Sequence, residues 1–145
     1  MSKSPMHQRK PLALTIDDDP EFNKIMRLLL MRLGLDVQTT STPAEFLQEL
    51  KSSSPDICLV DLNFGELNAG FTIIKAIRSV LGPDLPIIVI SRFVDRQSIA
   101  HALEIGANDF LVKPLDQELL STKLSRYVKS EAIEDATLPL VKVPE

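Results

Sequence analysis

Three consecutive aspartates, Asp17–Asp19, directly follow the apolar run Leu12–Ile16 in the segment LTIDDDPEF. Two unit charges ~4 Å apart repel each other by on the order of 4 kcal/mol at an effective dielectric constant near 20. A fold that gathers such carboxylates at the end of a buried strand therefore needs a reason to do so. The cluster indicates a cation site or a reaction that uses negative charge.

Other reactive side chains follow later apolar runs in the same way. They are Asp61 after Ile57–Val60, Ser91 after Ile87–Ile90, and Lys113 after Phe110–Val112. Clustered carboxylates with no histidine or cysteine beside them favour a hard divalent cation such as Mg²⁺, which also binds phosphate oxygens. A lysine is a point charge for a phosphate, and an aspartate can attack phosphorus to form an aspartyl phosphate. These residue types together predict Mg²⁺-assisted phosphoryl transfer.

An alternation of apolar runs and helical patterns predicts the fold that positions these groups. Runs that are apolar on both faces are typical of parallel strands covered by helices on both sides. Right-handed crossovers then give an α/β fold with a doubly wound, five-stranded parallel sheet, and ligands bind beyond the carboxyl ends of its strands. We expect strands over 12–16, 36–40, 57–60, 87–90 and 110–112, and helices over 20–33, 43–52, 71–81, 95–105 and 116–129.

Local signals support these helices. Asp19 before Pro20 and Thr42 before Pro43 are typical of a helix cap followed by proline at the first helical position. The helical spacing of apolar residues also predicts the buried faces, and it assigns Ile25, Val80 and Leu119 to them.

The composition limits the class of protein. A chain of 145 residues with 44% hydrophobic and 25% charged residues suits one globular domain. The net charge of -4 argues against direct nucleic-acid binding. The single cysteine, Cys58, excludes an internal disulfide and suits a reducing compartment.

No apolar stretch approaches ~18 residues and the polar N-terminus does not resemble a secretory signal, so we expect a cytoplasmic protein without membrane contact. We expect a flexible tail over 1–10, a domain over 11–130 and a linker or tail over 131–145.

Four motifs occur in a fixed order along the chain: DD after the first strand, LVDLN at the third, IIVIS at the fourth and GANDFLVKPL at the fifth. Together they resemble the receiver domain of two-component response regulators, from Pro11 to Tyr127. The stretch GANDFLVKP is the most specific of them. The resemblance implies a flavodoxin-like strand order of 2-1-3-4-5 with five helices.

The resemblance also implies a role for each matching residue. Asp61 matches the phosphoacceptor. Asp17 and Asp18 match the acidic pair that binds Mg²⁺ together with Asp61, and Asn63 matches the residue whose backbone carbonyl binds the metal. Ser91 matches the switch hydroxyl, Phe110 matches the switch aromatic, and Lys113 matches the phosphoryl-binding lysine before a cis proline. The third aspartate, Asp19, keeps its role as the helix cap.

In such domains, phosphorylation changes the face formed by the fourth helix, the fifth strand and the fifth helix, which is a population shift between two packings. The phosphoryl group comes from a sensor histidine kinase or a phosphotransfer protein. A downstream effector protein or output domain reads the change, and some such domains form homodimers. The domain's own chemistry is limited to self-phosphorylation and autodephosphorylation.

Two features depart from the family's pattern. In the stretch DLNFGELNAG, Gly65 stands at the usual proline, and Gly70 comes nine residues after Asp61 instead of eight. Arg92 follows the switch hydroxyl, where a small residue is usual. Arg92 is either a solvated loop residue or a modulator that overhangs the phosphoryl site and hinders attacking water.

Two other functions fit part of the pattern. In a haloacid-dehalogenase-like phosphatase, Asp17 would be the nucleophile and Asp19 the acid/base, although VKPLDQELL lacks that family's late acidic pair. An interaction module that keeps the fold without being phosphorylated is the third reading. The identity of the aspartate that carries phosphate separates the first two.

Overall fold

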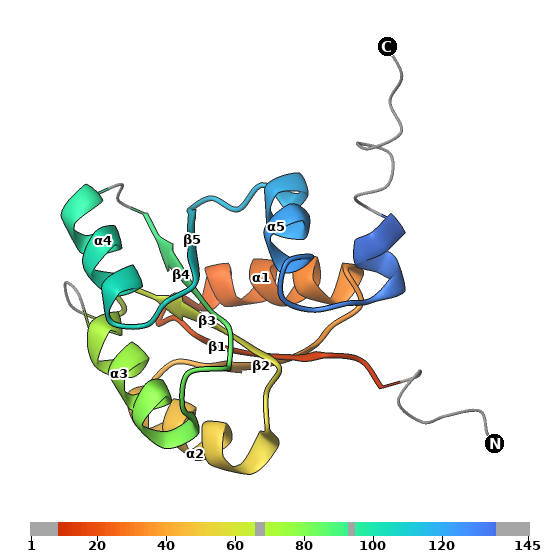
Figure 1. The fold of residues 1–145 in the computed structure, drawn as a ribbon. Helices are drawn as coiled ribbons and strands as arrows, with labels where there is room; N and C mark the ends of the chain where they lie inside the picture. The colour runs from red at the N-terminus through yellow and green to blue at the C-terminus, as the bar shows by residue number, and fades with distance from the viewer. Residues whose placement is uncertain (1–8, 66–68, 93–94, 136–145) are drawn as a thin grey trace.

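The computed structural model describes residues 9–65, 69–92 and 95–135 (Figure 1). A five-stranded parallel sheet has the order β2-β1-β3-β4-β5, which confirms the predicted α/β fold and strand order. Its strands are β1 (Leu12–Ile16), β2 (Asp36–Thr40), β3 (Ile57–Asp61), β4 (Ile87–Ser91) and β5 (Asp109–Val112). The tail predictions for residues 1–8 and 136–145 lie outside the described residues.

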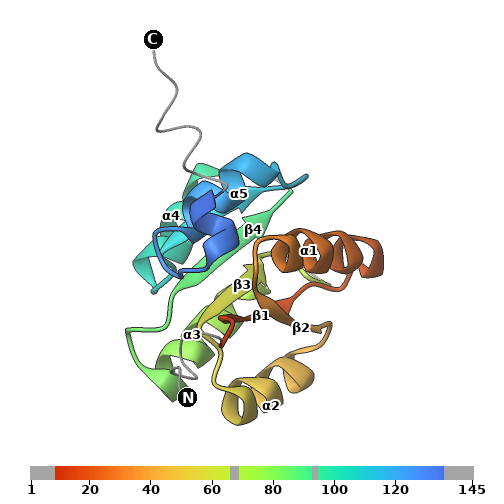
Figure 2. The ribbon, with the colours of Figure 1, turned by 90° about the vertical axis from the view of Figure 1, so that its right-hand side faces the viewer.

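Helices cover both faces of the sheet, as its two-sided apolar strands require. The helices are α1 (Pro20–Arg32), α2 (Pro43–Ser53), α3 (Gly70–Leu81), α4 (Arg96–Glu104) and α5 (Gln117–Leu124). Figure 2 shows α1 and α5 on one side of the sheet and α2 on the other. One hydrophobic cluster lies under α1 and α5, and a second lies under α2, α3 and α4. No helix in the described ranges has both the length and the apolar character needed to cross a bilayer.

Parallel pairing brings the carboxyl ends of the strands to one edge. Ile16 pairs with Thr40 and Val60, Asp61 pairs with Ile90, and Ser91 pairs with Val112. Residues that directly follow β1 and β5, or that end β3 and β4, therefore share one edge of the sheet.

Both predicted helix caps are confirmed. An Asp19 side-chain oxygen accepts hydrogen bonds from the backbone N–H groups of Glu21 and Phe22, at 3.0 and 3.4 Å. The Thr42 hydroxyl accepts one from the Glu45 N–H at 3.2 Å. Each cap satisfies a backbone donor at the helix start that has no partner within the helix.

The end of the last predicted helix is wrong: α5 stops at Leu124 instead of continuing to residue 129. The N–H groups of Arg126 and Tyr127 donate to carbonyls three residues back, which tightens the chain into a turn. Val128 is buried, as its spacing predicts, but from this turn and not from a helix.

A further short helical segment over 131–135, which the sequence pattern did not predict, packs against the end of α1. Ile133 is 1% exposed and belongs to the cluster under α1 and α5. The Ser130 hydroxyl donates to the Leu33 carbonyl at 2.6 Å and accepts from the Ile133 N–H at 3.0 Å. Figure 1 shows this dark-blue segment beside the far end of α1.

Three side chains expected on buried faces are exposed. Ile25, Val80 and Leu119 are 51%, 44% and 45% exposed. A helix packed on a sheet buries only a stripe of its surface. On α1, Phe22, Met26 and Leu30 fill that stripe. The buried face predicted from helical spacing alone was therefore wider than the one in the structure.

Arg78 on α3 forms hydrogen bonds with two loop segments. Its guanidinium donates to the Gly106 carbonyl at 2.7 and 3.1 Å, to the Gly82 carbonyl at 3.0 Å and to the Asn108 side chain at 3.1 Å. The same Asn108 oxygen accepts from the Ile87 N–H at 2.7 Å, at the start of β4. Arg78 thus links the end of α3 to the segment that leads into β5.

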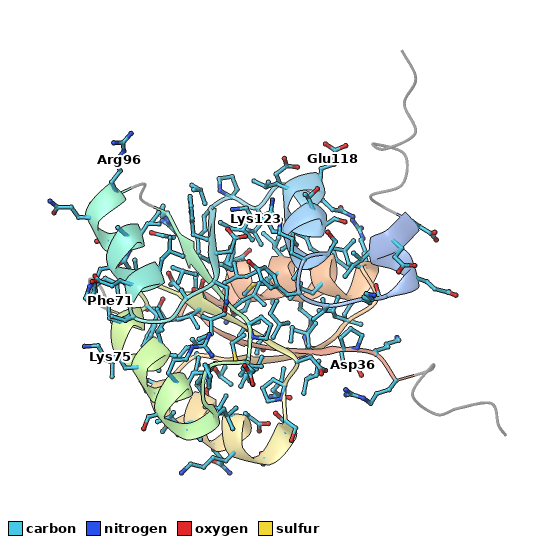
Figure 3. The ribbon with its side chains drawn as sticks, in the orientation of Figure 1. Asp36, Phe71, Lys75, Arg96, Glu118 and Lys123 are labelled. Atoms are coloured by element: carbon cyan, nitrogen blue, oxygen red, sulfur yellow. The ribbon has the colours of Figure 1, made fainter. Side chains whose placement is uncertain are left out.

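We expect Arg78→Ala to lower the free energy of unfolding by about 2 kcal/mol, because several charge-assisted hydrogen bonds are lost together. Urea denaturation measures the loss. Arg96→Ala is the control, since Arg96 projects away from α4 (Figure 3), and we expect a change within about 0.5 kcal/mol. Equal losses in the two variants would contradict this role.

Candidate functional site

Three carboxylates meet where β1 and β3 end. Asp17, Asp18 and Asp61 each offer one oxygen, and these oxygens all lie within 4.8 Å of one another. The side chains of Asp17 and Asp61 are 1% and 8% exposed, whereas Asp18 is exposed. Hard oxygen donors from carboxylates, with an open side toward solvent, suit an ion such as Mg²⁺ that keeps several waters.

Lys113 supplies the positive charge beside this cluster. Its ammonium nitrogen lies 2.7 Å from an Asp17 oxygen and 3.7 Å from an Asp61 oxygen, and its side chain is 8% exposed. The Lys113 N–H donates to the Ser91 carbonyl at 2.9 Å, which fixes the backbone, and the peptide bond to Pro114 is cis, as the family resemblance implies. The ring of Phe22 lies under the ammonium group, with its centroid 4.1 Å away.

Asp61 has an altered acidity. Burial and the neighbouring Asp17 raise the pKa of Asp61 from 3.8 to about 6, against the opposing effect of Lys113. In mildly acidic solution a proton therefore competes with any cation or phosphoryl group for this carboxylate.

Asn63 and Ser91 lie beside Asp61. The Asn63 N–H donates to an Asp61 oxygen at 3.2 Å, and the Asn63 side-chain amide donates to the Ser91 hydroxyl at 3.3 Å. Ser91 is buried at the end of β4. The sequence-predicted residues from β1, β3, β4 and the segment after β5 are thus neighbours in space.

A cavity of about 220 Å³ opens above the carboxylates. Its lining comprises Asp18, Asp19, Asp61, Asn63, Arg92 and Lys113. The Arg92 guanidinium lies 3.9 Å from an Asp19 oxygen with 63% of its side chain exposed. Arg92 therefore lies at the rim of the cavity, where its side chain is solvated and can still reach the opening.

Comparisons with known proteins agree with this arrangement. The sequence profile of the response regulator receiver domain matches residues 13–125. The chain belongs to this family. Receiver domains are modules of two-component systems, and this one has a five-stranded parallel sheet.

Its relatives include longer regulatory proteins. The transcriptional regulatory protein ZraR of Escherichia coli is 29% identical over 128 residues, which cover 88% of this chain and 29% of ZraR. The transcriptional regulatory protein KdpE of Mycobacterium tuberculosis is 30% identical over 118 residues, which cover 81% of this chain and 51% of KdpE. The chain thus spans less than a third of ZraR and about half of KdpE.

Solved structures of response regulators have the same fold. A two-component response regulator from Clostridium difficile superposes with a TM-score of 0.75 at 26% identity, covering 81% of this chain and 95% of that one. The Vibrio cholerae chemotaxis protein CheY4 has the same fold, with a TM-score of 0.75 at 24% identity over 82% of this chain and 99% of that one.

Both glycines that depart from the family's pattern have a local reason in this receiver. The Gly65 N–H donates to an Asp18 oxygen at 2.8 Å, and Gly65 has a φ of 72°. Proline has neither that N–H nor access to positive φ. A Cβ on Gly70 would lie 2.8 Å from the Asp61 carbonyl oxygen, so only glycine fits there without a shift of the backbone.

Phe110 of this receiver lies outside the carboxylate cluster, in a charged network that sequence reasoning missed. Lys123 donates to Asp109 at 2.8 Å and to the Phe110 carbonyl at 2.5 Å, and its ammonium lies 4.5 Å from the centre of the Phe110 ring. Figure 3 labels Lys123 where α5 faces β5.

Asp109 is the acidic centre of this network. Burial by itself raises the pKa of Asp109, but hydrogen bonds from Lys123, the Phe110 N–H and Tyr127 outweigh it and hold the pKa below its ordinary value. Arg126 adds a second cation, 3.0 Å from the carboxylate. The available signal was an aspartate at the start of an apolar strand, with two basic residues on the segment that follows.

Proposed function

We propose that this receiver accepts a phosphoryl group on Asp61 in a Mg²⁺-dependent reaction. The observation that carries the proposal is the position of the Asp61 carboxylate, which is buried beside two further carboxylates and 3.7 Å from the Lys113 ammonium. A cavity of about 220 Å³ adjoins it.

The transfer uses Asp61 as the nucleophile. A carboxylate oxygen of Asp61 forms a bond to phosphorus while the P–N bond of a phosphohistidine breaks, and the electron pair stays on the imidazole nitrogen. Lys113 and the Ser91 hydroxyl bind the phosphoryl oxygens, on which negative charge accumulates.

Asp17, Asp18, Asp61 and the backbone carbonyl of Asn63 are the proposed holders of Mg²⁺. When bound, the ion offsets the charge of the carboxylates and of the phosphoryl oxygens. The donor set supports this assignment because it consists of oxygens alone and includes an exposed member, Asp18.

Signalling follows from the new group on Asp61. The Ser91 hydroxyl and the Phe110 ring change position, and the face of α4, β5 and α5 changes its binding. The proposed partners are a sensor histidine kinase or phosphotransfer protein in the cytoplasm and an effector protein or output domain, with homodimerisation through the same face. The domain's own catalysis is self-phosphorylation and autodephosphorylation.

Intact-mass analysis after incubation with acetyl phosphate tests the proposal. The wild type should gain a Mg²⁺-dependent phosphoryl adduct, and Asp61→Asn should gain none. An adduct that survives Asp61→Asn but is lost in Asp17→Asn would favour a phosphatase with Asp17 as nucleophile, although Asp19, its acid/base, caps α1 here. No adduct with either donor, acetyl phosphate or a phosphorylated histidine protein, would favour an interaction module.

Arg92 is the proposed modulator of phosphoryl lifetime. Because Arg92 lines the cavity from its rim, we expect Arg92→Ala to admit water and raise the dephosphorylation rate about threefold, or about 0.7 kcal/mol of barrier. Loss of the adduct over time by intact mass measures the rate. Arg92→Lys is the matched control for charge, and an unchanged rate in Arg92→Ala would leave Arg92 a solvated loop residue.

A further inference from the structure

Phe22 contacts the site without contributing a polar atom to it. It lies in the first turn of α1, is 8% exposed, and places its ring centroid 4.1 Å from the Lys113 ammonium nitrogen. The Asp19 side chain accepts a hydrogen bond from the Phe22 N–H at 3.4 Å, so the helix cap also positions the backbone of Phe22. A cation over an aromatic face is attracted by the ring's quadrupole, and the attraction grows when water is excluded.

The carboxylates that neighbour Lys113 are also candidate metal ligands. The Lys113 ammonium nitrogen lies 2.7 Å from an Asp17 oxygen and 3.7 Å from an Asp61 oxygen. Both are also in the group of carboxylates that could hold a metal ion. If Asp17 turns toward a cation, Lys113 loses its nearest partner. The Phe22 ring has no oxygen, so it stabilises the ammonium group without competing for the cation.

We propose that Phe22 is a positioning residue that holds the Lys113 ammonium toward Asp61 while Asp17 serves the metal. This inference rests on the proposed function, because the ammonium is useful in that place only if a phosphoryl group arrives on Asp61. The ring acts as a platform on which Lys113 can exchange Asp17 for phosphoryl oxygens without becoming solvated.

Phe22 also belongs to the hydrophobic cluster under α1 and α5, so a test must separate packing from positioning. Phe22→Leu keeps an apolar side chain and removes the aromatic face, whereas Phe22→Tyr keeps the face. Phe46→Leu is the packing control, because Phe46 is fully buried in the cluster on the other side of the sheet.

The decisive measurement compares two affinities. Calorimetry gives the affinity for Mg²⁺, and fluorine NMR gives the affinity for the phosphoryl analogue beryllofluoride at saturating Mg²⁺. We expect Phe22→Leu to weaken beryllofluoride binding about tenfold and to change Mg²⁺ affinity less than twofold. Phe22→Tyr should stay within about twofold of the wild type for both ligands.

A double-mutant cycle tests the contact itself. Urea denaturation of Phe22→Leu, Lys113→Met and the double variant, without Mg²⁺, should show a coupling of about tenfold in the unfolding equilibrium constant. An additive cycle, or a loss of beryllofluoride affinity no larger than that of Phe46→Leu, overturns the inference.

The two proposals fail in different ways. A wild type that binds neither beryllofluoride nor phosphoryl on Asp61 overturns the proposed function, and with it the role of the ring toward a phosphoryl group. A wild type that binds both, with Phe22→Leu equal to its packing control, overturns the role of Phe22 alone.

Discussion

Replacing Asp61 with asparagine should raise the free energy of unfolding by about 2 kcal/mol at pH 8 without Mg²⁺. Burial and Asp17 raise the pKa of Asp61 from 3.8 to about 6. Each unit of pKa corresponds to about 1.4 kcal/mol. Asparagine also loses the attraction to the Lys113 ammonium, which offsets part of the gain in stability. The residue proposed for the chemistry therefore destabilises the fold that carries it.

The sign of the effect sets its dependence on pH. Between the unfolded pKa of 3.8 and the folded pKa of about 6, the native carboxyl group retains a proton that the unfolded chain has released. The contribution of Asp61 to stability therefore falls as pH rises through this window, and above it the ionised group has its full destabilising effect.

Urea denaturation at pH 8 and pH 4, with a chelator present, checks this prediction. The gain from Asp61→Asn should be largest at pH 8 and close to zero at pH 4. Asp36→Asn is the control, because Asp36 is exposed at the start of β2. A gain that is equal at both pH values would contradict a charge-based origin.

Replacing Lys113 with methionine should have the opposite effect and lower the free energy of unfolding by about 3 kcal/mol at pH 8. The substitution leaves the carboxylates of Asp17 and Asp61, 1% and 8% exposed, without the ammonium group that lies 2.7 and 3.7 Å from them. Removing one partner from a buried ion pair is costly because the remaining charge stays desolvated.

Two further measurements identify the cause of that loss. Lowering the pH to 5 should restore part of the stability of Lys113→Met, since Asp61 can then take a proton. Adding Asp61→Asn to the same chain should also restore part of it. Lys75→Met, at an exposed position on α3, is the matched control and should change stability little. A Lys113→Met variant as stable as the wild type at pH 8 would rule out a stabilising role for the Lys113 ammonium.

Sequence patterns predicted the sheet well because the relevant signals are local. The apolar runs that become β1, β3 and β4 are bounded by polar residues and turns, and the caps at Asp19 and Thr42 depend on neighbours within three residues. Parallel topology then brings Asp17, Asp61 and Lys113 to one edge, although the roles given to them remain predictions. The family is established by the match over residues 13–125.

The features that escaped prediction depend on distances across the fold. The contact of Phe22 with Lys113 joins residues 91 positions apart in the chain. The network at Asp109 needs the turn after Leu124 to bring Arg126 and Tyr127 back to β5. Periodicity cannot predict such contacts, because it reports which side of an element is apolar and not what lies opposite.

The contact between Ser130 and Leu33 fixes the position of the last described segment against α1. Helix α1 starts beside the acidic cluster at Asp19 and ends at the opposite edge, where Ser130 and Ile133 pack against it. A five-residue strand spans about 16 Å between these edges, so Ser130 and Ile133 lie on the side of the domain remote from Asp61. Communication between the two ends is then a free-energy coupling, and couplings are reciprocal. If the state of Asp61 changes the affinity of a partner that binds at the Ser130 end, binding of that partner must change the affinity of the acidic site for its ligand by the same factor.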